Sequence, residues 1–526
     1  MKVLARAMAS AIALTWCAAA AAAVPTAHVA QGRLEGLQEG PIDAFLGIPY
    51  AAPPVGRNRW RAPGPAPHWS GTRTATHFGA SCWQPRVPRD GFGPWTHEYV
   101  ALDTPVSENC LYLNVWMPRA RSAREPVLVW IHGGGFIGGS GSVPIYDGAR
   151  LAAHGIVVVT INYRLGPLGF LITPGLAREA VSAHEPPGNY GLQDMIAALR
   201  WIRGNIAAFG GDPGEVTVAG QSAGAIAIND LLVSPLAAGL FQRAIIESGL
   251  PSTAPAIPLA RAERTGEAFM RSRGVRTSSA LRALPPARLM SPGGPMSGPR
   301  YAPIVDGVLL PGPPGRLLGA GRDAVVPVLI GMNADERSAS SPETATVSTT
   351  EWRTFLRTAF GDMTPRFARL YPAATGFERA RAQRALQTDL GLAALYGWAR
   401  LRLAHAHAPV YAYLWTHAEP GPQSARWGAF HSSEVPYVFG TLGAAPSRPF
   451  TSTDRRISRR MSAYWVNFVK TGDPNGQRLA DWPVLRRPGG DIMALGARMN
   501  ARPILAPRVL SAMKAFMARG GRTGLF

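Results

Sequence analysis

The chain of 526 residues contains only three cysteines, and after its first two dozen residues it has no long apolar run. So few cysteines exclude a small scaffold held together by many disulfides. A helix that crosses a bilayer needs about 20 consecutive apolar residues, so no stable membrane insertion is expected beyond the N-terminal segment. His405 and His407 have no partners at metal-ligand spacing, so no metal ion is expected either.

Negative charge and lysine are also scarce. The chain has 54 basic residues, of which only three are lysines, and 33 acidic ones, so its net charge is +21. The arginines are scattered rather than clustered with aromatic residues, which argues against a nucleic-acid partner. The densest run, at residues 455–460, is predicted to be the solvated face of a helix that begins near Asp454. The positive field of such a chain disfavours cationic substrates.

The N-terminal segment has the order of a secretory signal peptide. Lys2 and Arg6 precede an apolar run that ends in alanines at residues 21–23. The run is short for a membrane anchor. A lipoprotein signal at Cys17 is disfavoured because Trp16 occupies a position that needs a small residue. We expect cleavage near Ala23 and a secreted or periplasmic protein.

Cys82 and Cys110 are the two cysteines that remain after this cleavage. In an exported chain they are expected to pair, because disulfides persist in oxidising compartments. The bridge would close a loop of about 27 residues, worth roughly 3.5 kcal/mol in the chain-entropy model. Two buried free thiols are the alternative.

Short β-branched runs alternate with longer segments of helical character. The runs lie at residues 127–131, 156–161, 216–218, 325–330 and 410–414, and helices are predicted over 192–209 and 223–232. This alternation predicts an α/β fold with a mostly parallel sheet covered by helices. The segment 285–314, rich in proline and glycine, is predicted to be a loop. Because no linker divides the chain, residues 24–526 are expected to form one domain.

A G-x-S-x-G pattern at residues 220–224 stands between a predicted strand and a predicted helix. This is the context of a nucleophile elbow, where a serine at the tip of a sharp turn exposes its hydroxyl group. Gly220 and Gly224 suit the turn because side chains at these positions would collide. The pattern alone is weak evidence, but its context makes Ser222 a candidate nucleophile.

Glycines at 133, 134 and 135 follow the strand predicted at 127–131, after the single residue His132. Glycines let backbone N–H groups approach a carbonyl oxygen closely, as an oxyanion hole requires. The same stretch matches G-x-G-x-x-G through Gly138, so a dinucleotide-dependent oxidoreductase has to be weighed. Pro144 and the glycines up to Gly148 argue against the helix that pyrophosphate binding needs.

Both features belong to a series of motifs that runs along the chain. The others are FLGIPYA at 45–51, PPVG at 53–56, SENCLYLNV at 107–115, NYRLG at 162–166, NYGLQD at 189–194, FGGDP at 209–213, GDPN at 472–475 and WP at 482–483. In this order they resemble the type-B carboxylesterases, the cholinesterase-related serine esterases. Asn109 stands where that family more often has aspartate. The resemblance implies the α/β-hydrolase fold and hydrolysis of carboxylic esters without a cofactor.

The resemblance also implies a catalytic triad in the order Ser, Glu, His. Ser222 is its nucleophile, Glu336 matches the acid after the strand at 325–330, and His431 matches the family's histidine loop at 430–440. His431 would take the proton of Ser222, and Glu336 would orient the imidazole. Asp335 is the neighbouring alternative for the acid, and Arg337 stands where the family has glycine.

Further positions follow from the same resemblance. The N–H groups of Gly134, Gly135 and Ala223 are expected to form the oxyanion hole. Ser248 matches a serine that supports the triad acid in relatives. The loop closed by the two cysteines shapes the wall of the active-site gorge in relatives, so Trp83 or Trp95 on this loop are candidates for the pocket wall.

A hydrolase of neutral carboxylic esters, with a small-molecule ester as its partner, is therefore the favoured function. The first alternative is a binding protein of the same fold that has lost its catalytic residues, and the intact Ser222, Glu336 and His431 argue against it. Amides and carbamates stay open as substrates, because one sequence does not reveal which residues line an acyl pocket. The sequence makes no prediction of the oligomeric state.

Overall fold

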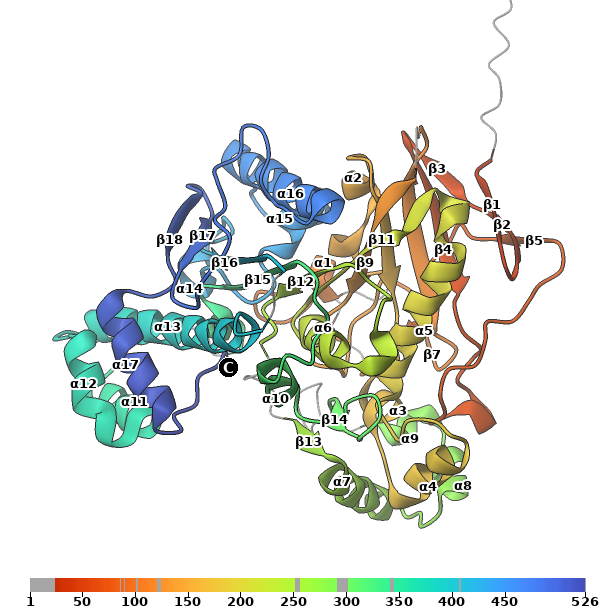
Figure 1. Cartoon of the computed structure of the whole chain (residues 1–526), viewed down its shortest axis with the longest axis horizontal. Coiled ribbons are helices and arrows are strands. Elements are labelled where there is room, and N and C mark those ends of the chain that lie inside the picture. Colours follow the sequence, from red (N-terminus) through yellow and green to blue (C-terminus); the bar gives the residue numbers. More distant parts are fainter. Residues whose placement is uncertain are drawn as a thin grey trace, which may run out of the picture.

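The β-branched runs of the sequence become strands of one large twisted sheet (Figure 1). The computed structural model describes residues 24–85, 87–88, 90–100, 103–120, 124–250, 256–290, 301–340, 345–405 and 408–525. The predicted signal peptide, at residues 1–23, lies outside the described residues, and so does His407. Among the helices that are described, none has the length and apolar character needed to cross a membrane.

The described residues form an 11-stranded sheet in the order β18-β17-β16-β15-β12-β11-β9-β10-β8-β4-β3. Neighbours from β10 to β17 pair in parallel, and the strands outside them pair antiparallel. The strands are β3 (Leu37–Glu39), β4 (Ile42–Pro49), β8 (Tyr112–Pro118), β9 (Glu125–Ile131), β10 (Val157–Ile161), β11 (Gly211–Gln221), β12 (Arg243–Glu247), β15 (Val328–Asn333), β16 (Val410–Trp415), β17 (Asp491–Leu495) and β18 (Asn500–Pro503).

Smaller sheets lie outside the large one. They are formed by β1 (Thr26–Val29), β2 (Gly32–Glu35) and β5 (Thr72–Thr74), by β6 (Ser81–Cys82) and β7 (Val106–Ser107), and by β13 (Ile257–Pro258) and β14 (Ile304–Val305).

Helices alternate with the strands along the chain. They are α1 (His97–Val100), α2 (Ala149–Ala152), α3 (Gly166–Phe170), α4 (Pro174–Ser182), α5 (Tyr190–Asn205), α6 (Ala223–Val233), α7 (Leu259–Ser272), α8 (Ser278–Arg282), α9 (Pro286–Leu289), α10 (Pro314–Gly319), α11 (Thr349–Phe360), α12 (Thr364–Leu370), α13 (Gly376–Arg402), α14 (Ser424–Trp427), α15 (Val435–Phe439), α16 (Ser452–Thr471) and α17 (Pro507–Ala518).

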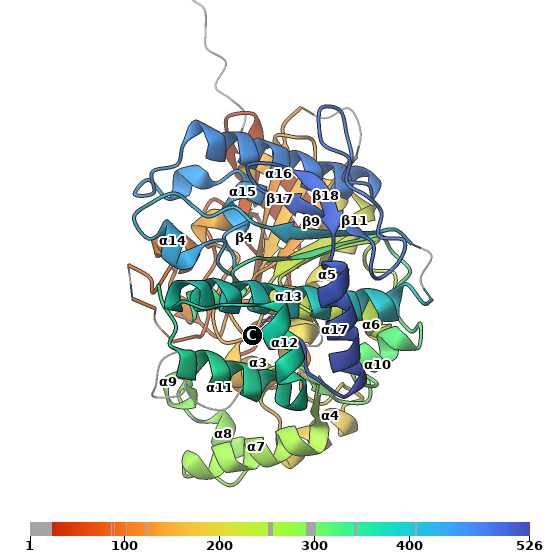
Figure 2. The same cartoon turned by 90° about the vertical axis from the view of Figure 1, so that its left-hand side faces the viewer.

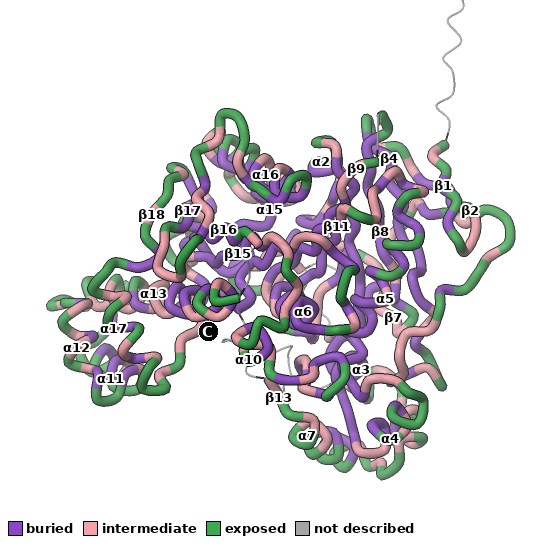
Figure 3. Tube along the Cα trace, viewed as in Figure 1, coloured by how far each residue is buried: buried purple, intermediate pink, exposed green. Residues whose placement is uncertain are grey.

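The two faces of the sheet are covered by different helices. Successive side chains of a strand point to opposite faces, so Val127 and Val129 of β9 join the hydrophobic cluster under α5, α6 and α13. Leu128 and Trp130 join the cluster under α2, α15 and α16. The strands between these layers are almost wholly buried (Figure 3). This double cover explains why the central strands are apolar throughout rather than alternating.

Four helices form a group of their own at one side of the molecule. The contacts between α11 and α12, between α12 and α17, and between α13 and α17 hold them together, and Figure 2 shows them in front of the sheet. Helix α13 continues to the sheet, where Arg402 is fully buried and pairs with Asp323, which precedes β15. A buried charge is tolerated only when it is paired in this way.

The predicted secondary structure agrees with the structure in type and roughly in position. Each of the five predicted runs overlaps a strand of the sheet, and the two predicted helices overlap α5 and α6. The strand β11 is longer than predicted, and the segment 285–314 contains the short elements α9 and β14. The strand β12 was not predicted, because its five residues include charged ones at both ends.

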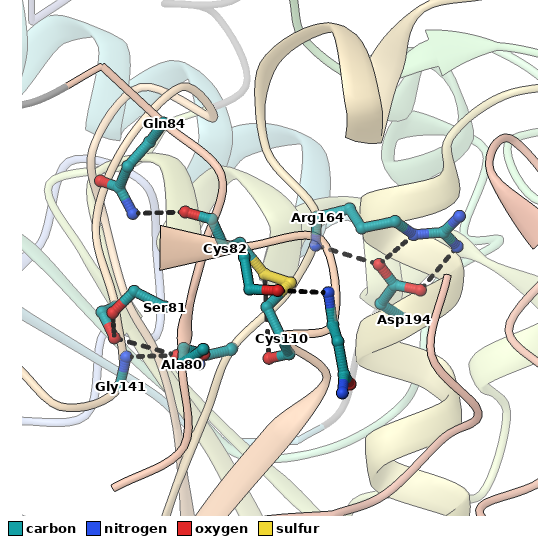
Figure 4. The surroundings of a disulfide bond; sticks show 12 residues. Ala80, Ser81, Cys82, Gln84, Cys110, Gly141, Arg164 and Asp194 are labelled. Carbon is teal, nitrogen blue, oxygen red and sulfur yellow. Dashed lines mark hydrogen bonds and ion pairs between the residues drawn. A yellow bond between two sulfur atoms is a disulfide. The ribbon is translucent and has the colours of Figure 1, made fainter. Parts of the chain in front are cut away.

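Cys82 and Cys110 form the expected disulfide, and both are buried. Figure 4 shows the bridge beside the buried ion pair of Arg164 and Asp194. The carbonyl group of Cys82 accepts a hydrogen bond of 3.0 Å from the Gln84 amide. The loop that the disulfide closes is therefore anchored in the interior at its start.

Loss of this disulfide should lower the free energy of unfolding. For the double variant Cys82→Ala, Cys110→Ala we expect a loss of about 3 kcal/mol, because the unfolded chain regains the entropy of the opened loop. Urea-induced unfolding measures it. Wild type is reduced, and a thiol count confirms that both cysteines are free; its free energy of unfolding should then equal that of the variant. Reductant should not change the free energy of unfolding of the variant. Equal stability of oxidised and fully reduced wild type would contradict the prediction.

Candidate active site

Ser222 sits at a sharp turn between β11 and α6. Its backbone has φ 57° and ψ −121°, a conformation that non-glycine residues rarely adopt. A Cβ atom on Gly224 would lie 2.0 Å from the carbonyl oxygen of Ile131, and one on Gly220 would lie 2.6 Å from the same atom. Glycine is therefore required at both positions, because the end of β9 packs directly against the turn.

The glycine loop after β9 lies against Ser222. An added Cβ on Gly133 would lie 3.0 Å from the Ser222 Cβ atom. Gly134 and Gly135 have φ values of 107° and 64°, which favour glycine. Within the described residues neither N–H group donates a hydrogen bond. Ala223 is the first residue of α6, where helix N–H groups have no acceptor inside the helix.

His132 and Gln84 hold this glycine loop in place. The His132 ring stacks on Tyr163 at 4.4 Å, and its Nδ1 atom lies 2.8 Å from the Gly133 carbonyl oxygen. Burial lowers the pKa of His132 to about 4, so the ring is neutral near pH 7. The Gln84 amide exchanges two hydrogen bonds of 2.8 Å with the backbone of Gly139, which connects the disulfide loop to the glycine loop.

The helix that a dinucleotide site needs does not follow these glycines. The chain continues through turns and a short 3-10 helix at Pro144–Tyr146, and α2 begins only at Ala149. Pyrophosphate binding depends on a helix N-terminus directly after the glycines. The G-x-G-x-x-G match is therefore not a dinucleotide-binding motif in this fold.

His431 and Glu336 meet inside the protein. The Nδ1 atom of His431 forms a short contact with Oε2 of Glu336, and the two residues are 6% and 3% exposed. Glu336 follows the end of β15, and its Oε1 atom accepts a hydrogen bond of 2.8 Å from the Asn333 N–H group. The carboxylate is thus fixed from both of its oxygens.

Asp335, the alternative acid, points elsewhere. Its carboxylate pairs with Arg384 at 3.0 Å and accepts a hydrogen bond of 2.7 Å from the Ala429 N–H group. Within the described residues no ion pair joins Arg337 to Glu336, so the neighbouring arginine does not compete with the histidine.

The other ring nitrogen of His431 faces the nucleophile elbow. Its Nε2 atom lies 3.1 Å from the side-chain amide nitrogen of Gln221, the residue before Ser222. The Oε1 atom of Gln221 lies 2.8 Å from the place where a Cβ on Gly133 would be. The Gln221 amide therefore lies between the histidine and the glycine loop. It was not singled out from the sequence, although it lies inside the elbow pentapeptide.

Ser248 lies in the same region, at the end of β12. It is buried with φ 55°, and among the described residues its hydroxyl group has no hydrogen-bond partner. The support that Glu336 receives comes from the Asn333 backbone instead. The role of Ser248 beside the acid stays a prediction. Within the described residues no group of three His, Cys, Asp or Glu side chains could hold a metal ion.

A model of the carboxylesterase family matches residues 23–511 of the chain. The chain belongs to this family. It is 38% identical over 497 residues to a fumonisin B1 esterase of Sphingopyxis macrogoltabida, covering 90% of this chain and 87% of the relative. It is 35% identical to a para-nitrobenzyl esterase of Bacillus subtilis (strain 168), covering 89% and 94%.

Solved structures give the same result. A PNB esterase superimposes with a TM-score of 0.75 at 32% identity, covering 93% of this chain and all of the other. The predicted α/β-hydrolase fold is confirmed. The chain is a carboxylic-ester hydrolase, and its family acts on small-molecule esters.

Two more buried carboxyl groups lie behind the histidine of this carboxylesterase. Burial, with Glu336 as the second cause, raises the pKa of Glu434 to about 7. Burial and then Glu434 raise the pKa of Glu247 well above its usual range. Glu434 accepts a short hydrogen bond from the Asn333 amide, and Glu247 accepts one of 2.7 Å from the Trp465 indole. The sequence could not reveal that these acids share one buried region.

The raised pKa of Glu434 makes the stability of this carboxylesterase depend on pH. Between the usual carboxyl range and about pH 7 the folded state keeps a proton that the unfolded state releases, so this contribution to stability falls as pH rises through that window. The variant Glu434→Gln removes this titrating carboxyl group and its pH-dependent contribution to stability. The free energy of unfolding of the variant relative to wild type should therefore rise by about 3 kcal/mol from pH 5 to pH 8.

Urea-induced unfolding at both pH values measures this difference. Glu267→Gln, a change at an exposed carboxylate of α7, is the matched control and should show no such trend. A constant difference between Glu434→Gln and wild type across this range would contradict the prediction.

Proposed function

We propose that this carboxylesterase cleaves neutral carboxylic esters through an acyl-enzyme, with Ser222 as nucleophile, His431 as general base and Glu336 as the acid that orients it. The observation that carries the proposal is the position of the His431 ring. Its Nδ1 atom contacts Glu336, while its Nε2 atom faces the elbow residue next to Ser222. A histidine whose Nδ1 atom faces a carboxylate can use its Nε2 atom to accept a proton from the nucleophile side.

The reaction would proceed in two halves. Ser222 attacks the ester carbonyl carbon as His431 accepts its proton, and the tetrahedral intermediate then expels the alcohol, which takes that proton. Water, activated by the same histidine, cleaves the acyl-enzyme and releases the acid. The N–H groups of Gly134, Gly135 and Ala223 would bind the oxyanion, and loss of one such donor typically costs about 10²–10³ in rate.

Glu336 would act without becoming protonated. A carboxylate at Nδ1 favours the tautomer with the proton on Nδ1, in which Nε2 can act as a base, and it stabilises the imidazolium that forms. The Asn333 N–H group restrains the carboxylate for this task. No step needs a cofactor or a metal ion.

Aryl and short alkyl esters are the substrates that we propose first. The name of the para-nitrobenzyl esterase relative favours esters with an aromatic part. Amide or carbamate cleavage uses the same nucleophile and is the second candidate. A binding protein without catalysis is disfavoured because the serine, the histidine and the acid are all present.

We also propose that the protein is exported and that residues 24–526 work as one domain. The buried Cys82–Cys110 disulfide supports export, because such bonds persist in oxidising compartments.

Ser222→Ala should abolish ester hydrolysis. We expect a loss of about 10⁶ in kcat on p-nitrophenyl esters of graded acyl length, because no other group can form the acyl-enzyme. The matched control is Ser234→Ala, a buried serine at the opposite end of α6, which should keep the activity within a few-fold. If wild type and Ser222→Ala are equally inactive on every ester, amides and carbamates are tested next. Inactivity there too would favour the binding protein.

A pair of neighbouring variants identifies the acid. Glu336→Gln should lower kcat by about 10⁴, because an amide favours the wrong imidazole tautomer. Asp335→Asn should lower it only a few-fold, since its partners are Arg384 and the Ala429 backbone. The same ester assay compares both with wild type, and equal losses in the two variants would contradict the assignment.

A further inference from the structure

The loop closed by Cys82 and Cys110 reaches the histidine as well as the glycine loop. Trp95, which lies on this loop, donates a hydrogen bond of 3.0 Å from its indole N–H group to the backbone carbonyl oxygen of His431. The two rings also meet edge to face, with centroids 6.4 Å apart and an interplanar angle of 85°. One side chain therefore contacts both the ring and the backbone of the proposed base.

The carbonyl group that Trp95 binds belongs to an unusual peptide unit. Ser432, directly after His431, has φ 82°, a left-handed conformation that residues with a Cβ atom rarely adopt. The chain keeps such a conformation only where surrounding contacts fix it. The indole hydrogen bond restrains the orientation of this peptide plane, which includes the Cα atom that carries the His431 side chain.

Trp95 is itself held on both sides. The Arg448 guanidinium donates hydrogen bonds of 2.7 Å to the Pro94 carbonyl oxygen and 2.6 Å to the Thr96 hydroxyl oxygen. The Phe92 ring packs against the indole at 5.1 Å. An indole in such a framework can act as a fixed support rather than a mobile side chain.

The residue before the histidine is packed against the same loop. Tyr99 contacts the Phe430 ring edge to face at 5.7 Å, and its hydroxyl group donates a hydrogen bond of 2.6 Å to Glu419. Arg448 pairs with both Glu419 and Glu98, so the loop and the segments on either side of His431 form one connected network.

We propose that Trp95 is a positioning residue for His431, acting through its hydrogen bond to the histidine backbone. The inference rests on the proposed function, because it assumes that His431 is the base. Catalysis needs reacting groups to be held within a fraction of an ångström, and small misplacements can cost orders of magnitude in rate. Loss of the indole N–H group should therefore slow the chemical step and leave substrate binding unchanged.

The test is Trp95→Phe, which keeps an aromatic ring and removes the donor. We expect kcat to fall about ten- to a hundredfold on p-nitrophenyl esters, with KM unchanged and with the same factor for short and long acyl chains. The control is Trp69→Phe. Trp69 is also partly buried and also donates its indole N–H group to a backbone carbonyl group, that of Arg33 in β2, at 2.8 Å. It should keep wild-type kinetics.

Two further measurements separate the explanations. Thermal unfolding and stoichiometric labelling by a fluorophosphonate show whether Trp95→Phe still folds around a reactive serine. If kcat is unchanged, or if KM rises with a loss that depends on acyl length, Trp95 is a pocket wall or a packing residue and the inference fails. An equal fall of kcat in Trp69→Phe would also contradict the inference. If Ser222→Ala is as active as wild type, the proposed function fails instead.

Discussion

The close contact between the end of β9 and the turn at Ser222 is the constraint on which the rest of the site depends. The Ile131 carbonyl oxygen leaves no room for a Cβ on Gly220 or Gly224. Parallel pairing of β9 with β11 brings these two segments together, and it puts the glycine loop and the nucleophile elbow at the same edge of the sheet. The strained backbone conformation of Ser222 persists because two packed hydrophobic layers hold both strands in place.

Several carboxyl groups lie near the same carboxyl-terminal ends of the strands. Glu247 ends β12, Glu336 follows β15, and Glu434 follows the histidine by three residues. Like charges in a buried site cannot all be ionised, so some of these carboxyl groups keep their protons at higher pH than usual. Glu336 meets His431, whereas the pKa values of Glu247 and Glu434 are raised, chiefly by burial. Below about pH 7, where Glu434 keeps its proton, these carboxyl groups add hydrogen-bonding capacity near the histidine without a second strong negative charge.

The sequence predicted the parts of this site that depend on local order. A strand before G-x-S-x-G and a helix after it were enough to place Ser222, and the ordered motifs singled out His431 and Glu336. The resemblance also implied the contact of Glu336 with His431, but the contacts that Trp95 and Gln221 make with His431 were not predicted. Trp95 and His431 are 336 residues apart, and Gln221 and His431 are 210 apart. Their meeting depends on how the disulfide loop and the histidine loop fold over the sheet, which no local pattern records.

The net charge of +21 has a simpler consequence once the fold is known. The buried arginines are matched, as Arg59 is with Glu108 and Arg164 is with Asp194, so they add little to the outer field. On α16 the arginines at residues 455, 456, 459 and 460 are exposed while Ile457 and Met461 face the core, as the predicted solvated helix face requires. The excess charge is therefore at the surface, where it attracts anions and repels cations over about 8 Å at physiological salt. Such a surface favours neutral or anionic esters over cationic ones before any contact with the site is made.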